Sequence, residues 1–213
     1  MKSKRGLFIT IEGIEGAGKS TVIAFIADFL RKHEIDFVTT REFGGTEIAE
    51  KIRHVILSHH DEIMCDDTEL LLAFAARAQH LSALITPALT SGKWVLCDRF
   101  TDSSYAYQGG GRGIPEERIS VIENWVQGDL RPDFTILLDI DPEVSFARIK
   151  TKTLDRIEVE KKYFFQKVRE CYLKRAKREP KRFRIVDANE NQEGVLKQLE
   201  KILTEIVKSY VEK

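Results

Sequence analysis

Cysteine is scarce in this chain of 213 residues, and neither sign of charge is in excess. The three cysteines, Cys65, Cys97 and Cys171, are scattered and form no C-x-x-C pair, so the sequence indicates neither a zinc site nor a disulfide framework. The 34 lysines and arginines balance 34 aspartates and glutamates. A net charge of zero argues against a protein that binds nucleic acid through an overall basic surface.

Long apolar runs are also missing, as are internal repeats and low-complexity linkers. No stretch reaches the length that spans a bilayer, and the first residues run directly into an apolar segment without a signal peptide. We therefore expect a cytoplasmic protein without a membrane partner. One domain is the default at this length, which is sufficient for a sizeable core.

Residues 13–20, GIEGAGKS, fit the phosphate-binding pattern G-x-x-x-x-G-K-[ST]. An apolar, β-branched segment precedes them and a helical pattern follows, which is the context that this motif requires. Glycines let backbone N–H groups face phosphate oxygens at the positive end of a helix. Lys19 is predicted to reach the β- and γ-phosphates, and Ser20 to ligate Mg²⁺. The predicted ATP site comprises Gly13, Ile14, Glu15, Gly16, Ala17, Gly18, Lys19, Ser20 and Thr21.

Strand and helix patterns alternate along the chain. Strands are predicted at residues 7–11, 37–40, 94–97, 134–138 and 183–186. Helices are predicted at residues 21–30, 46–58, 68–89 and from 194 onward, the third being disturbed near Pro87. The glycine-rich residues 109–113 are interpreted as a loop. The pattern predicts an α/β protein, a three-layer P-loop NTPase fold with a doubly wound, five-stranded parallel sheet. Ligands then bind beyond the carboxyl ends of the strands.

Charged residues follow the predicted strands. Arg41 follows the second strand, and Asp98 and Arg99 follow the third. An arginine beside bound phosphates forms a fork for a second phosphoryl group, although a surface ion pair is the simpler alternative. Asp98 is a candidate ligand of Mg²⁺ or of its water, with a helix N-cap as the alternative.

Longer segments resemble thymidylate kinases in their order and spacing. They are TTREFGGT at 39–46, FAARAQ at 74–79, DRF at 98–100, SSYAYQGGGRG at 103–113 and LDRIE at 154–158. The resemblance covers nearly the whole chain. It implies a kinase that uses ATP and Mg²⁺ to convert dTMP to dTDP for dTTP synthesis, commonly as a homodimer. It also implies one nucleoside monophosphate kinase domain, residues 1–213, with a lid at about 148–160.

The resemblance assigns roles around the transferred phosphate. Glu15 matches a residue that meets the 3′-hydroxyl and phosphate region of the acceptor, and Arg41 and Arg99 match residues that hold the acceptor phosphate. Gly16 stands where one branch of the family has an arginine, which resembles the bacterial branch with a basic lid. The implied catalytic residues are Lys19, Glu15, Arg99 and the lid residues Arg148, Lys150, Lys152 and Arg156.

The resemblance also assigns a base pocket. Arg77 matches a residue that hydrogen-bonds the thymine carbonyl, and Ser104 and Gln108 match residues that read the base edge. Tyr107 matches one that crowds the ribose 2′ position. Phe74 lies three residues before Arg77, whereas the stacking aromatic of the family commonly lies four before. Stacking by Phe74 and a core position for Phe74 both remain open.

A second departure is Phe43, which stands where the family usually has proline. A cis peptide bond before a residue other than proline costs about 2.5–4 kcal/mol. We therefore predict a trans bond between Glu42 and Phe43, with Gly44 and Gly45 providing the change of direction. The alternative is a cis bond that surrounding contacts hold.

Two other functions are weighed. A kinase of another nucleoside monophosphate, such as dUMP, stays open, because the sequence does not rank dTMP against dUMP. A GTP-binding switch requires an N-K-x-D motif and a D-x-x-G after the third strand, and neither is present.

Overall fold

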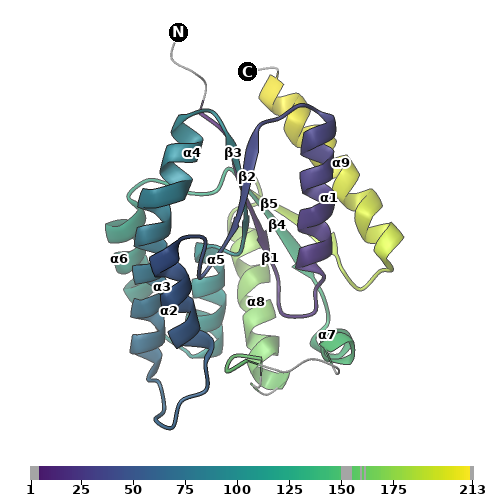
Figure 1. Cartoon of the computed structure of the whole chain (residues 1–213). Coiled ribbons are helices and arrows are strands. Elements are labelled where there is room, and N and C mark those ends of the chain that lie inside the picture. Colours follow the sequence, from purple (N-terminus) through teal and green to yellow (C-terminus); the bar gives the residue numbers. More distant parts are fainter. Residues whose placement is uncertain (1–4, 150–154, 159, 161, 212–213) are drawn as a thin grey trace.

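The computed structural model describes residues 5–149, 155–158, 160 and 162–211 (Figure 1). Five parallel strands form one sheet in the order β2-β3-β1-β4-β5. Their bounds are Phe8–Glu12 for β1, Phe37–Arg41 for β2, Trp94–Asp98 for β3, Phe134–Asp139 for β4 and Phe183–Asp187 for β5. The predicted five-stranded parallel sheet is confirmed.

Helices cover both faces of the sheet, with α1 and α9 on one side in Figure 1 and α3, α4 and α6 on the other. The α-helices are α1 Lys19–Lys32, α2 Glu47–Leu57, α3 Asp66–His80, α4 Thr86–Thr90, α5 Thr101–Ser104, α6 Glu116–Gln127, α7 Pro142–Ile149, α8 Lys162–Arg178 and α9 Gln192–Val211. Two π-helical segments are η1 Leu81–Ile85 and η2 Tyr105–Gly111. Within the described residues, no helix combines the length and apolarity needed to cross a membrane.

Strand β1 lies at the centre of the sheet and is buried along its whole length. A central parallel strand is covered on both faces, which explains its continuous apolar run. The register places Asp98 of β3 opposite both Ile11 of β1 and Arg41 of β2. The ends of these three strands therefore meet at one edge of the sheet, where the phosphate loop begins.

The predicted helix over residues 68–89 is made of α3, η1 and α4. The irregular π-helical turn ends just before Pro87, which occupies the first turn of α4. Proline has no backbone N–H to donate, so the first turn of a new helical segment is a position that tolerates it. The predicted disturbance near Pro87 is confirmed.

The loop predicted at residues 109–113 is wrong for its first three residues, which belong to η2. Gly110 and Gly111 allow close packing against α8. A Cβ at Gly110 would lie 2.7 Å from the Cβ of Cys171, and one at Gly111 would lie 2.4 Å from the ring of Phe164. The glycines are therefore required by contact between helices, which a local pattern does not reveal.

Candidate active site

A cavity of about 590 Å³ opens at the carboxyl ends of the strands. The phosphate loop and the start of α1 form one wall, and the ends of β2 and β3 form another. Arg148 of α7 and residues 155, 157 and 158 also line it. The predicted site residues that line the cavity are Glu15, Gly16, Gly18, Lys19, Ser20, Thr21, Arg41, Asp98, Arg99, Tyr107 and Arg148.

The phosphate loop depends on glycine at three positions of positive φ, namely Gly13, Gly16 and Gly18. Lys19 lies across the loop, and its Nζ donates to the carbonyl oxygens of Gly13 and Ile14, each at 3.1 Å. Burial, aided by the charge of Arg99, lowers the pKa of Lys19 to about 8. Anionic phosphates bound in the loop would stabilise the charged form and raise this pKa.

Glu15 joins two other predicted site residues in one cluster. Its carboxylate accepts a hydrogen bond from Arg99 at 2.7 Å and another from the hydroxyl of Tyr107 at 2.7 Å. The guanidinium of Arg99 also lies 4.9 Å from the centre of the Tyr107 ring. Arg99 has a φ of 66°, a left-handed conformation that is uncommon for a side chain of this size. Such conformations cluster at functional sites.

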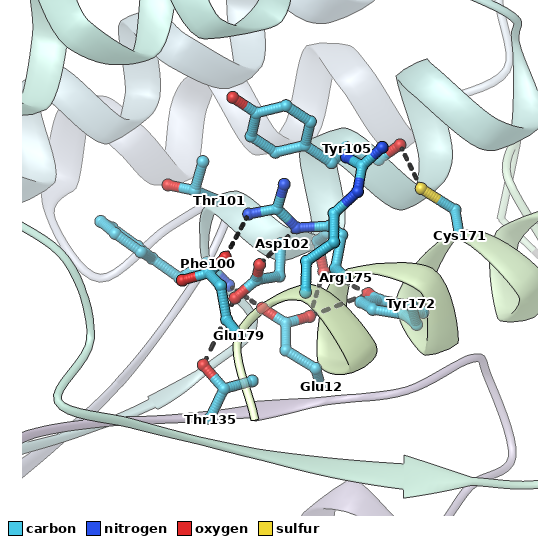
Figure 2. A network of polar contacts seen from close by, with 12 residues as sticks. Glu12, Phe100, Thr101, Asp102, Tyr105, Thr135, Cys171, Tyr172, Arg175 and Glu179 are labelled. Atoms are coloured by element: carbon cyan, nitrogen blue, oxygen red, sulfur yellow. Dashed lines mark hydrogen bonds and ion pairs between the residues drawn. The ribbon is translucent and has the colours of Figure 1, made fainter. Parts of the chain in front are cut away.

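Two further hydroxyl groups, which the sequence did not indicate, bind the guanidinium of Arg99. Its NH1 lies 3.3 Å from the hydroxyls of Ser103 and Tyr172. Both hydroxyls contact the buried carboxylate of Glu12, which also accepts from the backbone N–H of Phe100 at 2.7 Å (Figure 2). Glu12 ends an apolar strand, as Asp98 does, and this same signal would have identified it.

Arg41 reaches the cavity wall from the end of β2. In this structure its guanidinium pairs with Glu50 of α2 at 2.9 Å, and its side chain is 54% exposed. It is therefore accessible to an anion in the cavity. Arg53 lines the same wall and donates to the carbonyl oxygen of Glu42 at 3.1 Å, and the sequence reasoning did not single it out.

Asp98 and Ser20 line the cavity together. The Oδ1 atom of Asp98 is buried and has no hydrogen-bond partner among the described residues. A carboxylate and a hydroxyl are oxygen ligands of the kind that Mg²⁺ takes, usually with substrate phosphates and water. The described part of the chain contains no group of three or more metal-binding side chains. The donor set thus fits a magnesium ion shared with a nucleotide.

The predicted base-reading residues lie behind the cavity wall. Phe74, Arg77, Ser104 and Gln108 are buried, and none lines the cavity. Arg77 forms an ion pair with Glu42 at 2.6 Å and donates to Ser104 at 3.0 Å. Its guanidinium lies 4.4 Å from the centre of the Phe74 ring. Base reading by these residues stays a prediction.

The peptide bond between Glu42 and Phe43 is cis, so the predicted trans bond is wrong. The trans bond was favoured because the local sequence shows no network of contacts that would hold a cis bond. Groups distant in sequence hold the residue before the bond, since Arg77 binds the carboxylate of Glu42 and Arg53 binds its carbonyl oxygen. Such long-range contacts are not readable from the local sequence.

The four predicted lid residues have different places. Arg148 lines the cavity from α7. Lys150 and Lys152 lie outside the described residues. Arg156 binds the carboxylate of Glu69 and donates to the carbonyl oxygen of Ile56 at 2.8 Å, and it does not line the cavity. A catalytic role for these residues stays a prediction.

A family model described as thymidylate kinase matches residues 11–199. The chain belongs to the thymidylate kinase family. It is 54% identical over 203 residues to a thymidylate kinase of Pseudomonas putida, covering 95% of this chain and 97% of that one. It is 52% identical over 201 residues to that of Vesicomyosocius okutanii, covering 94% and 98%.

A solved structure of the thymidylate kinase from Ehrlichia chaffeensis is similar with a TM-score of 0.75 and 29% identity, covering 96% of this chain and 99% of that one. The family assignment confirms the P-loop NTPase fold and an enzyme of the phosphotransferase class. Nothing in these comparisons favours a nucleotide-binding switch.

Proposed function

We propose that this protein transfers the γ-phosphate of ATP to dTMP, giving dTDP and ADP for dTTP synthesis. The observation that carries the proposal is one cavity in which the Lys19 loop faces Arg41 and Arg99. The reaction needs cationic groups for two phosphate-bearing substrates, and the two walls supply them. Membership of the thymidylate kinase family supports the choice of reaction.

ATP lies with its phosphates in the loop, where backbone N–H groups and Lys19 neutralise them. Arg41 and Arg99 hold the phosphate of dTMP. An oxygen of that phosphate attacks the γ-phosphorus, and the bond from the γ-phosphorus to the oxygen bridging it to the β-phosphorus breaks. The attacking oxygen is already anionic near neutral pH, so the residues act by positioning and by charge neutralisation.

Ser20 and Asp98 are the residues that would hold Mg²⁺, which neutralises charge on the phosphate oxygens when bound. The ion pair between Glu15 and Arg99 sets the direction of the Arg99 guanidinium. Tyr107, bonded to the same carboxylate, presents its ring near the acceptor ribose. A lid at about 148–160 closes over both nucleotides and excludes water.

The thymine base is placed against Phe74, Arg77, Ser104 and Gln108, which are buried and do not themselves line the cavity. Two of these residues carry a buried polar atom without a partner among the described residues, NH1 of Arg77 and Oε1 of Gln108. Burying such atoms unpaired costs about 1–3 kcal/mol each, so a ligand that pairs them is favoured.

The same proposal includes a homodimer and a cytoplasmic location. Helices α3 and α6 pack together and carry exposed apolar side chains, namely Leu71 at 55%, Val121 at 69% and Trp125 at 85% exposure. A self-complementary contact between two copies would cover such side chains. Light scattering of the wild type and of Trp125→Glu measures the assembly, and a monomeric wild type overturns this part.

A coupled assay with ATP and each of dTMP, dUMP, dCMP and dGMP tests the reaction. We expect the highest kcat/KM with dTMP. Lys19→Ala should lower phosphoryl transfer by about 10²-fold or more, because a preorganised cation at the transferring group is lost. Absence of dTDP formation by the folded wild type would refute the proposed function.

A further inference from the structure

Glu69 of α3 is a buried carboxylate that three side chains bind. Nε2 of Gln108 donates to its Oε1 at 2.8 Å. Arg112 donates to its Oε2 at 3.2 Å, and Arg156 donates to the same oxygen. Burial raises the pKa of Glu69, but the bond from Gln108 and the charges of Arg112 and Arg156 outweigh it, so the net pKa is lowered. Glu69 is therefore ionised near neutral pH.

An ionised carboxylate accepts hydrogen bonds and donates none. The amide of Gln108 must therefore direct its nitrogen to Glu69, because the opposite orientation would place two acceptor oxygens 2.8 Å apart. The other end of the amide, Oε1, is then fixed as a hydrogen-bond acceptor. Oε1 is buried and unpartnered within the described residues, so a hydrogen bond from a ligand would satisfy it.

Arg77 presents the complementary group. Its Nε and NH2 are bound by Glu42, and NH2 also donates to Ser104, which lies one helical turn before Gln108. This leaves NH1 as a buried donor without a partner in the described part of the chain. Two buried carboxylates, Glu42 and Glu69, thus fix one free donor and one free acceptor. The donor belongs to a side chain that contacts Ser104, and the acceptor lies one helical turn after Ser104.

A free donor beside a free acceptor matches the edge of an imide base. Thymine and uracil present a carbonyl oxygen next to a ring N–H group. The carbonyl oxygen accepts a hydrogen bond from Arg77, and the N–H group donates one to Gln108. Cytosine presents an amino group next to an unprotonated nitrogen, so both contacts would be repulsive. Selectivity against a reversed hydrogen-bond pattern is large, since buried polar groups are left unpaired.

We propose that Glu69 is a specificity-determining positioning residue, which makes the enzyme select imide pyrimidines over cytosine by fixing the amide orientation of Gln108. The inference rests on the proposed function and adds a residue that does not itself touch the substrate. A glutamine at position 69 is able to donate as well as accept, so it would release Gln108 to rotate.

The test compares kcat/KM for dTMP and for dCMP, at saturating ATP, in the full-length wild type and in Glu69→Gln. We expect the dTMP to dCMP ratio to fall about tenfold in Glu69→Gln, with KM for ATP unchanged. Glu69→Asp keeps a pure acceptor and should retain the wild-type ratio even where kcat falls. In the background of Gln108→Leu, Glu69→Gln should cause no further fall.

Glu123→Gln is the matched control. Glu123 is also buried, and it accepts from the hydroxyl of Tyr105 at 2.6 Å in the same helical segment as Gln108. This variant should lose stability without a change in the substrate ratio. An unchanged ratio in folded Glu69→Gln overturns the inference while leaving the kinase function intact. A wild type inactive with dTMP overturns both.

A crystal structure of the wild type with dTMP decides the matter if Glu69→Gln does not fold. The expected complex has Nε2 of Gln108 on Glu69 and Oε1 within hydrogen-bond distance of a ring nitrogen of the base. A complex in which Oε1 contacts no base nitrogen overturns the inference.

Discussion

The charge of Lys19 depends on what the cavity holds. Its pKa is about 8 in the free protein, because burial and Arg99 disfavour the ammonium form. Bound phosphates favour that form, so the pKa rises on binding. Near and above pH 8, the complex therefore holds more protons than the free protein. We predict that ATP binding takes up protons at about pH 8.5 and weakens as pH rises further.

Calorimetry in two buffers of different ionisation enthalpy measures this proton uptake. Lys19→Met is the control, since it keeps the length of the side chain without a titrating group. Equal proton uptake by the wild type and Lys19→Met would show that another group titrates.

Sequence reasoning identified single site residues better than it identified their partners. Glu15, Arg99 and Tyr107 were named separately, and the fold brings them into one cluster. Glu42 and Glu69 were missed, although each fixes a predicted base-reading residue. Their partners lie 35 and 39 residues away in the chain, and a local pattern carries no information on such pairs.

Helix η2 is the element in which local pattern and tertiary packing disagree. Its glycines read as a loop, yet close contact with α8 makes them helical. The strands were predicted to within one residue. For β1, β3 and β4 the signal is the apolar run of a buried parallel strand, whereas β2 and β5 are partly exposed edge strands. The sequence therefore indicated the strands, whereas it misassigned the glycines of η2 and did not indicate helices α6, α7 and α8.

A methyl group at Gly111 tests this contact. The added Cβ would meet Phe164 at 2.4 Å, so Gly111→Ala should lower the free energy of unfolding by about 1–3 kcal/mol through overpacking. Gly109→Ala is the matched variant in the same helix, since its Cβ would meet the end of the Ile119 side chain at 3.2 Å and the carbonyl oxygen of Ile114 at 3.7 Å, both longer than the contact at Gly111. Urea denaturation compares the two. A smaller loss for Gly111→Ala than for Gly109→Ala would contradict the packing argument.

Two buried acids, whose pKa values are shifted in opposite directions, make the stability of the whole molecule depend on pH. Burial and the nearby Asp102 raise the pKa of Glu12 to about 7. Burial opposes ionisation of Asp102 as well, but the charges and hydrogen bonds of Arg175 and Arg182 outweigh it and lower its pKa to about 2. Figure 2 shows both carboxylates in one network that joins β1, α5 and α8.

The raised pKa of Glu12 means that the folded protein holds a proton that the unfolded chain releases above about pH 4.5. Stability therefore falls as pH rises from 4.5 to 7 and is lower above that range. The lowered pKa of Asp102 acts in the opposite direction, since its contribution is present above about pH 3.8 and is lost as pH falls towards 2. The combined contribution of Glu12 and Asp102 to the free energy of unfolding is therefore greatest near pH 4 to 5.

Glu12→Gln tests the predicted loss of stability as pH rises above about 4.5. Glutamine keeps the shape of the side chain and has no proton to lose, so the variant should lose less stability than the wild type between pH 5 and pH 8. Urea denaturation at pH 5, 6.5 and 8 gives the two slopes. A wild-type slope retained in Glu12→Gln would assign the pH dependence to other groups. Because Glu12 contacts Ser103 and Tyr172, which hold Arg99, the same variant should also reduce turnover with dTMP more than it raises KM for ATP.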